Sequence, residues 1–357
     1  MIVRAAVDAD RPAWDALIAA QPAADPLQAW AWGEVNGRHG ERPVRLVLES
    51  TDGTGGLVGL AQLLVRPSTA GRSIGYLAHG PIWRRDHPGD LAALLEGVAA
   101  AARRERAIVV KVDPRAMPIE AASEAGQVSD ADAVAELLES AGLRPARQDL
   151  QARTTRIVDL TGDSAAVWAR WEPDARTRVR RASKEGVSTS VDRAGDPAVV
   201  STLAALHAGT AERADFRARP PAFLADAAAA FAPSGGWLAV EGRLAGEPVA
   251  AMGFLRVGDR AAYLWGGSSR APDAERSRAQ YAVLGAAMEA LAADGCRSLD
   301  LWGVVEVDDE AAQPEAAGYS RFKRKFGGLP LRHPGTFDLI VDALWYRLRD
   351  ARERLRG

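Results

Sequence analysis

Apolar runs separated by turn-forming stretches organise the first third of the chain. Short β-rich runs predict strands over 44–49, 57–66 and 74–77. Leucine and valine at helical spacing then predict a helix over 89–106. A further apolar run over 107–113, stopped by a proline, predicts a buried strand. The predicted order is an antiparallel meander, a crossover helix and one more strand.

The same order recurs about halfway along the chain. Strands are predicted over 237–241, 247–256 and 261–265, a helix over 276–293, and a closing strand over 298–302.

Two pairs of residues fix the offset between the halves. Tyr76 and Tyr263 are 187 positions apart, and so are Asp113 and Asp300. Equal offsets at two landmarks indicate an internal duplication.

Each half resembles the GNAT acyltransferase fold in its layout. We therefore expect an α/β (α+β) protein with two tandem GNAT-like domains, each a mixed, mostly antiparallel sheet flanked by helices. The first domain is expected over 1–153, completed by the C-terminal segment 335–357, and the second over 154–334. GNAT enzymes cradle the pyrophosphate of acetyl-CoA in a glycine-rich loop before the crossover helix. Neither corresponding stretch, 83–89 or 269–276, has that loop, which disfavours a CoA donor.

Composition excludes several classes of protein. The length of 357 residues favours two domains. A single cysteine excludes an internal disulfide framework, and the five histidines show no metal-ligand spacing, so we expect neither a metal nor a cofactor. No apolar run reaches the length that crosses a bilayer, and the N-terminus lacks a signal-peptide layout. We expect a cytoplasmic protein.

Positive charge is concentrated locally although the net charge is −2. Residues 170–184 carry a balance of +4 and residues 317–332 a balance of +5. Such runs belong either to solvated faces or to a site for RNA or a phosphorylated ligand. Only four of the 45 basic residues are lysine: Lys111, Lys184, Lys323 and Lys325. In so arginine-rich a chain, these lysines mark positions where a compact ammonium is preferred to a guanidinium.

Seven segments in fixed order resemble the Fem family of aminoacyltransferases (FemX, FemA and FemB), in particular the compact FemX type. They contain all four lysines. The segments are 27–35, 75–81, 110–114, 176–186, 210–219, 263–268 and 319–328. The resemblance implies transfer of an amino acid from aminoacyl-tRNA to a stem-peptide amine of a peptidoglycan precursor, either UDP-MurNAc-pentapeptide or lipid II, with no DNA partner.

The resemblance also implies two catalytic groups. Lys323 matches the family's lysine after phenylalanine and would stabilise the negative charge that develops on the ester carbonyl oxygen. Asp113 matches an aspartate at a strand end and would orient the incoming amine or accept its proton. The structural alternatives are a surface lysine on a basic loop and an aspartate that fixes the turn before Pro114.

Substrate-binding positions follow from the same matches. The implied precursor-binding residues are Arg213, Arg217, Tyr263, Trp32, Asn36, Arg38 and Phe322. Asn36 stands where the family commonly has lysine, so its phosphate contact is either lost or taken over by Arg38. Trp32 would either line the binding site of the sugar or anchor its helix. Phe322 would either contact the substrate or pack within its own segment.

A basic helical stripe is the expected tRNA contact. Arg176, Arg180 and Lys184 follow one another at i, i+4 and i+8, and Lys325 would add a phosphate contact. The basic amphipathic helix expected from residue 344 would either dock on the first domain or rest on an anionic membrane, which would bring the protein to the inner face of the membrane.

Two other functions remain open from the sequence. One is a CoA-dependent GNAT enzyme that acylates a different amine, and the other is a non-catalytic RNA-binding protein built on the same fold.

Overall fold

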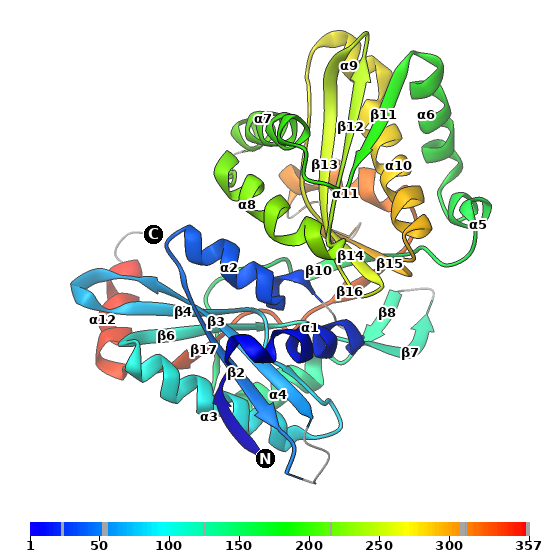
Figure 1. Cartoon of the computed structure of the whole chain (residues 1–357). Coiled ribbons are helices and arrows are strands. Elements are labelled where there is room, and N and C mark those ends of the chain that lie inside the picture. The colour runs from blue at the N-terminus through cyan, green and yellow to red at the C-terminus, as the bar shows by residue number, and fades with distance from the viewer. Residues whose placement is uncertain are drawn as a thin grey trace. The chain divides into compact units, whose positions relative to one another are not determined.

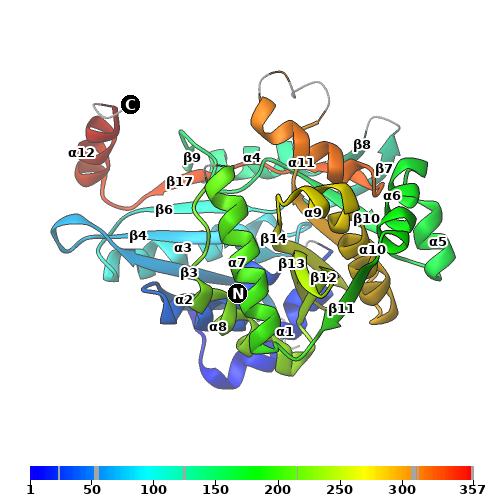
Figure 2. The ribbon, with the colours of Figure 1, turned by 90° about the horizontal axis from the view of Figure 1, so that it is seen from above.

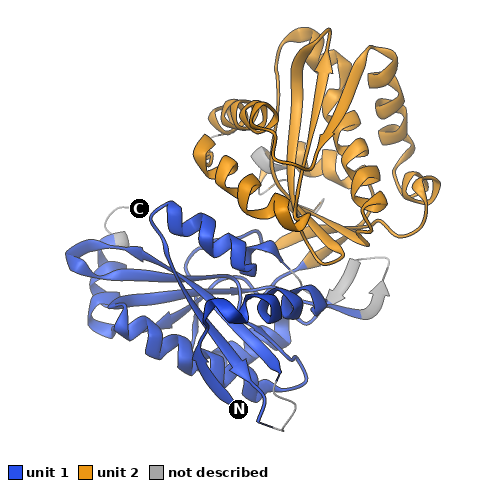
Figure 3. Cartoon of the chain, viewed as in Figure 1, with its two compact units in different colours: residues 1–153, 332–357 blue, residues 154–331 orange. Residues whose placement is uncertain are grey.

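The computed structural model describes residues 1–22, 25–51, 56–123, 126–214, 216–306, 311 and 313–354. The chain forms two compact units (Figure 1, Figure 3). Unit 1 comprises Met1–Arg153 together with Arg332–Gly357, and unit 2 comprises Thr154–Leu331. Within the described residues, no helix is long and apolar enough to cross a membrane.

Unit 1 is a mixed sheet with helices. Across the sheet the strands run in the order β1 (Ile2–Ala5), β2 (Arg42–Glu49), β3 (Leu57–Pro67), β4 (Ser73–His79), β6 (Ala107–Pro114), β17 (Phe337–Ile340) and β9 (Arg144–Pro145), and β5 (Ile82–Trp83) pairs with β3. The pairing is antiparallel except between β4 and β6. The helices are α1 (Arg11–Ala20), α2 (Trp30–Arg38), α3 (Pro88–Arg104), α4 (Ala131–Ser140) and α12 (Ala343–Arg354), and β7 (Pro118–Ser123) pairs with β8 (Gly126–Ser129).

The core of unit 1 lies where α3 covers the sheet. Leu94 and Val98 on α3 pack with Leu48, Leu63 and Val110 from the strands, and all five are fully buried. Burying each such side chain contributes about 1.5–3 kcal/mol, so this contact stabilises the order predicted from the apolar runs.

Unit 2 repeats this architecture. Its strands run in the order β11 (Val187–Asp192), β12 (Trp237–Leu244), β13 (Glu247–Val257), β14 (Arg260–Ser268), β15 (Ser298–Gly303), β10 (Thr154–Asp159) and β16 (Leu329–Arg332). Its helices are α5 (Ser164–Ala169), α6 (Pro173–Lys184), α7 (Pro197–Arg213), α8 (Pro221–Phe231), α9 (Pro272–Ser277), α10 (Ala279–Ala293) and α11 (Pro314–Arg324). Helices α7 and α8 cover one face of the sheet, and α6 and α10 cover the other (Figure 1).

The predicted strands and crossover helices are confirmed in both halves, with two differences in unit 2. The helix predicted over 276–293 is broken at Arg278, whose φ of 56° is left-handed, so that α9 ends before it and α10 begins after it. The strand predicted over 237–241 is longer, because β12 continues to Leu244. Ala245 and Gly246 form the turn with φ values of 51° and 86°, the pattern of a tight hairpin.

The two halves differ in the register of their parallel strands. In unit 1 Asp113 lies opposite Ala78, beyond Tyr76, whereas in unit 2 Asp300 lies opposite Ala262, before Tyr263. The equal sequence offsets therefore identify the same strands but not the same register.

Candidate functional site

Strands β14 and β15 separate in the middle of unit 2. They pair in parallel only from Arg260↔Ser298 to Ala262↔Asp300. Beyond these residues β14 continues along β13 to Ser268, while β15 continues along β10 to Gly303. In unit 1 the corresponding strands stay paired from Ser73↔Ala107 to His79↔Pro114. The separation of the two central strands is therefore found in unit 2 and not in unit 1.

A local turn bends β15 at the point of separation. The Asp300 carboxylate accepts a hydrogen bond from the Trp302 backbone N–H at 2.7 Å, and Trp302 has a left-handed φ of 65°. The register on β10 shifts between Thr155 and Ile157, as in a β-bulge. An aspartate that bonds the amide two residues ahead is a standard way to hold such a turn. Asp300 thus directs the end of β15.

Lys323 points its ammonium to this bent end. Its Nζ donates a hydrogen bond to the Gly303 carbonyl oxygen at 2.7 Å. The same atom lies 5.6 Å from the ring centre of Tyr263 and 5.0 Å from that of Tyr319. The side chain is only 8% exposed, and this burial lowers the pKa of Lys323 to about 8, against the opposing effect of Asp300. The result is a desolvated cation close to two aromatic rings.

Helix α11 holds the segment after β15 at two more points. The Ser320 hydroxyl oxygen accepts from the Val305 backbone N–H at 2.9 Å, and Arg324 donates to the Val305 carbonyl oxygen at 2.6 Å. Together with the Lys323 bond, these contacts fix the backbone around the ammonium. Preorganised groups of this kind lose little free energy to rearrangement during a reaction.

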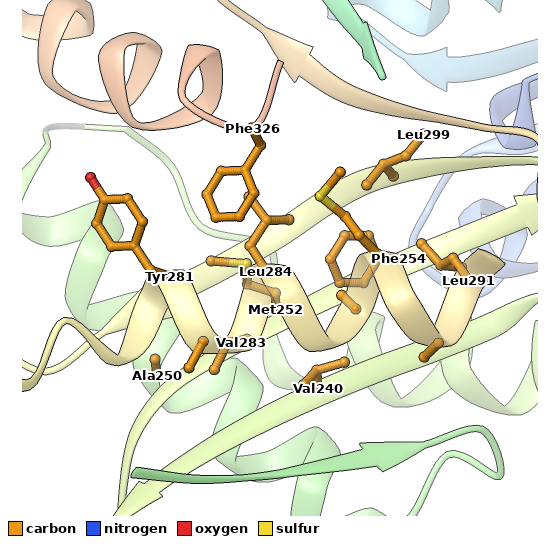
Figure 4. Close-up of a cluster of buried hydrophobic side chains, with 14 of the residues drawn as sticks. Val240, Ala250, Met252, Phe254, Tyr281, Val283, Leu284, Leu291, Leu299 and Phe326 are labelled. Carbon is orange, nitrogen blue, oxygen red and sulfur yellow. The ribbon is translucent and has the colours of Figure 1, made fainter. Parts of the chain in front are cut away.

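The residues after Lys323 anchor its helix in the core of unit 2. Phe326 is buried and packs against Tyr281 (Figure 4). Its ring also contacts those of Trp171 and Phe322. Arg156 then donates to the carbonyl oxygens of Gly327 and Gly328 at 2.8 and 2.9 Å. Phe322 therefore packs the segment that carries Lys323, and its predicted contact with substrate stays a prediction.

Tyr263 and Arg213 lie at the β14 side of the separation. Tyr263 packs on Phe254, and burial raises the pKa of its phenol. Arg213, at the end of α7, is exposed and donates to Thr210 Oγ1 and to the Ser268 carbonyl oxygen, both at 2.9 Å. Arg217 is exposed in the segment that follows α7. The structure thus places an exposed guanidinium at the end of β14.

Asp113 belongs to unit 1, where it lies in a buried polar network. Its Oδ2 accepts from Thr336 Oγ1 at 3.2 Å and from the Tyr76 hydroxyl at 3.4 Å. Tyr76 in turn accepts from Gln151 at 2.9 Å. Burial raises the pKa of Asp113, although the interaction with His79 acts in the opposite direction. A carboxylate in this state can take up a proton more readily than an exposed one.

Neighbouring charges in the same unit are also paired. Asp25 is fully buried and contacts His79 Nδ1 at 2.9 Å and Arg115 Nη1 at 2.7 Å. Burial acts to raise the pKa of Asp25, but its interactions with His79 and Arg115 hold that pKa below its usual range. The sequence analysis did not select Asp25 or Arg115.

The three precursor-binding candidates on α2 differ in exposure. Trp32 and Asn36 are buried, and the Asn36 amide donates to the Trp32 carbonyl oxygen of its own helix at 2.8 Å. Arg38, in the last turn, is exposed. Of the three, only Arg38 is exposed, and the precursor contacts of all three stay predictions.

The basic stripe of α6 forms the predicted helix but is partly neutralised. Arg180 and Lys184 are exposed, whereas Arg176 is half-buried and its Nη1 lies 3.3 Å from the Ala169 carbonyl oxygen at the end of α5. Lys325 forms an ion pair with Asp174, which also accepts from Arg178 at 2.8 Å. Within the described parts of the chain, no group of three or more His, Cys, Asp or Glu side chains could hold a metal ion.

The sequence analysis missed the roles of Tyr319 and Asp300. Tyr319 precedes Lys323 by one helical turn, and this i, i+4 spacing was a usable signal for contact. Nothing in the sequence pattern alone predicted the left-handed residue that Asp300 holds.

Comparison with known families and proteins agrees with this architecture. Residues 13–234 match the family model described as "FemAB family". Residues 173–324 match the model described as "Acetyltransferase (GNAT) domain".

Individual relatives are distant. The lipid II:glycine glycyltransferase of Staphylococcus saprophyticus subsp. saprophyticus is 27% identical over 226 residues, which are 62% of this chain and 52% of that protein. The chain thus spans about half the length of that curated relative. The crystal structure of FemX superposes with a TM-score of 0.81 at 19% identity, covering 98% of this chain and 99% of that one. A tandem GNAT protein from the clavulanic acid biosynthesis pathway gives a TM-score of 0.55 at 12% identity, covering 95% and 98%. These structures confirm the tandem GNAT-like fold.

Proposed function

This chain belongs to the FemAB family, and we propose that it transfers an amino acid from aminoacyl-tRNA to the stem-peptide amine of a peptidoglycan precursor. The acceptor is UDP-MurNAc-pentapeptide or lipid II. The observation that carries the proposal is the buried Lys323 ammonium, held beside separated strands of a GNAT-like sheet.

The reaction is the aminolysis of an ester. The neutral amine of the acceptor attacks the aminoacyl carbonyl carbon, and negative charge gathers on the carbonyl oxygen. The C–O bond to the ribose then breaks, the attacking nitrogen loses one proton, and the ribose oxygen takes up one proton and leaves as a hydroxyl. The Lys323 ammonium has three N–H donors, and one of them is given to Gly303. We assign a remaining donor to the carbonyl oxygen, where it stabilises the developing charge by a few kcal/mol.

The pKa of about 8 suits this role. At neutral pH most Lys323 side chains are still protonated, so the positive charge is present. The low local dielectric that lowers the pKa also strengthens the attraction to an oxyanion. Arginine would spread the charge over a larger plane and would not fit beside Tyr263 and Tyr319 in the same way.

The remaining assignments are proposals for binding. The resemblance assigns Asp113 of unit 1, whose pKa burial raises, to the acceptor amine, which it orients or deprotonates. Arg213, Arg217 and Arg38 are exposed and bind precursor phosphates, and Tyr263 orients the substrate. Arg180 and Lys184 on α6 bind the tRNA backbone.

Mass spectrometry of the acceptor tests this function. The purified protein is incubated with a pool of charged tRNAs and UDP-MurNAc-pentapeptide, and then with lipid II. We expect a mass gain of one amino-acid residue on one of these acceptors, and the gain identifies the donor. No gain on either acceptor, with tRNA binding intact, contradicts the proposal.

Two variants connect the activity to the site. Lys323→Ala should abolish transfer while tRNA binding is kept, and Lys323→Arg should retain only a small fraction of the rate. Micromolar affinity for acetyl-CoA would instead favour a CoA-dependent acyltransferase.

A further inference from the structure

Helix α12 is docked on unit 1 by one of its faces. It follows β17 (Figure 2), and it contacts β6. The Tyr346 hydroxyl donates to Asp338 at 2.7 Å, and Trp345 lies under the guanidinium of Arg72 at 5.1 Å. These contacts fix which face of α12 remains outside.

The outer face of α12 combines leucine with arginine. Leu344 is 66% exposed and Leu348 is 55% exposed, one helical turn apart. Arg347 and Arg352 are exposed on the same face. Exposed leucines at helical spacing, flanked by arginine, are typical of helices that lie in a membrane interface.

A groove continues this apolar surface into unit 1. It has a volume of about 310 Å³ and is lined by Ile74, Ile108, Trp345 and Leu348, with Arg349 and Arg352 also in its wall. Leu348 therefore belongs both to the exposed face and to the groove. Apolar side chains next to arginine match a ligand that has an apolar body and an anionic head.

Two acidic residues near this face are already paired in the part of the chain whose side chains are described. Asp342 forms an ion pair with Arg72 at 3.1 Å, and Asp350 forms one with Arg147 at 3.1 Å. The charge that α12 offers through Arg347 and Arg352 is therefore positive. A second copy of the same face would bring arginine against arginine, which disfavours a symmetric dimer here.

We propose that the outer face of α12, defined by Leu344, Arg347, Leu348 and Arg352, docks on a bilayer surface that contains anionic phospholipid. The leucines enter the boundary between head groups and acyl chains, and the arginines contact lipid phosphates. The inference rests on α12 and its groove alone and does not depend on the proposed transferase activity.

Vesicle co-sedimentation tests the proposal on the full chain. The vesicles contain phosphatidylcholine with about one quarter phosphatidylglycerol, an anionic fraction chosen to provide a negative surface, and pure phosphatidylcholine vesicles provide the comparison. We expect binding to the anionic vesicles that weakens as salt is raised.

Two pairs of substitutions separate the apolar and the charged contributions. Leu344→Gln with Leu348→Gln keeps helix propensity and should weaken binding on the order of tenfold or more. Arg347→Gln with Arg352→Gln should weaken it about fivefold per residue at low salt. Leu150→Gln is the matched control, because Leu150 is also an exposed leucine of unit 1 (48%) but lies outside α12, and it should bind like the unchanged protein.

Three results would overturn the proposal. They are failure of the unchanged protein to bind the anionic vesicles at low salt, equal binding by the leucine pair, and a dimer in solution that the leucine pair converts to a monomer. Circular dichroism and a thermal unfolding curve for each variant establish that the compared proteins are folded.

Discussion

Asp300 and Trp302 form a contact at the point where the two central strands of unit 2 separate. The carboxylate accepts the Trp302 backbone N–H at 2.7 Å, and Trp302 keeps a φ of 65°. The same aspartate raises the pKa of Lys323 through its negative charge. One side chain thus influences both the path of β15 and the protonation of the cation beside it.

Substitutions of Asp300 should separate its effect on the path of β15 from its effect on the protonation of Lys323. Asp300→Asn keeps an oxygen that accepts the backbone N–H but removes the charge, so the pKa of Lys323 should fall below about 8. The loss of transfer at alkaline pH should then begin at a lower pH, with little change in thermal stability. Asp300→Ala should also lose about 1 kcal/mol or more of stability, because the Trp302 N–H loses its partner.

Transfer rate against pH and thermal unfolding measure the two effects separately. Nucleophile ionisation is common to all the variants, so it does not contribute to the difference between them. An Asp300→Asn profile that coincides with that of the unchanged protein would show that the charge of Asp300 does not act on Lys323.

The buried ammonium of Lys323, to which we assign a catalytic role, should lower the free energy of unfolding. The unfolded chain holds the Lys323 proton up to its ordinary pKa of 10.5, whereas the folded chain releases it at about 8. Stability should therefore rise with pH between these values, because the unfolded state binds more protons there.

Lys323→Met removes this cost and should be more stable at pH 7. The expected gain is up to about 3 kcal/mol, less about 1 kcal/mol for the lost hydrogen bond to Gly303. The difference from the unchanged protein should shrink from pH 8 to pH 10.5, and denaturant unfolding at several pH values measures it. A Met variant that is less stable at every pH would mean that the ammonium is well solvated.

Gly327 should not tolerate a side chain. Its φ is 82°, and a Cβ there would lie 2.5 Å from the Arg170 carbonyl oxygen. Gly327→Ala should destabilise unit 2 by about 3 kcal/mol, the sum of a left-handed conformation and a backbone clash.

Gly246 provides the control for conformation alone. Its φ is 86°, and nothing lies within 4 Å of an added Cβ. Gly246→Ala should therefore cost only about 1 kcal/mol in the same unfolding experiment. Equal losses for the two variants would exclude the clash at Gly327.

The sequence predicted the elements of this fold better than their distortions. Apolar periodicity located β3, α3 and β13 because each buries a continuous apolar surface. The break at Arg278 and the turn at Trp302 depend on contacts made after the chain has folded, so neither periodicity nor composition predicts them.

In the candidate site too, the sequence predicts some features, and others depend on contacts made in the folded chain. Lys323 could be selected from the arginine bias and the resemblance, but its burial and its bond to Gly303 come from tertiary structure. Asn36 and Lys325 match substrate-contact positions in sequence, yet Asn36 is buried and Lys325 pairs with Asp174.

The exposed cations of α6 should carry part of the tRNA affinity. Arg180→Ala with Lys184→Ala should weaken tRNA binding, and the slope of log affinity against log salt should fall by about one to two, as expected for two lost phosphate contacts. Filter binding over a range of salt concentrations measures this slope.

Arg193→Ala is a control for the loss of positive charge, because it removes an exposed cation that lies outside α6. Arg193 is exposed but forms two hydrogen bonds with Asp294, at 2.8 and 3.1 Å. Its removal should leave the salt slope unchanged. The same loss in both proteins would indicate a general effect of net charge rather than a contact by α6.

The position of β17 has a consequence for biosynthesis. This strand lies between β6 and β9 in the sheet of unit 1, yet it follows all of unit 2 in the chain. A ribosome therefore delivers every residue of unit 2 before the sheet of unit 1 can close. Until β17 is delivered, the nascent chain holds β6 with an unfilled edge, so the sheet of unit 1 cannot be completed before the whole of unit 2 has been synthesised.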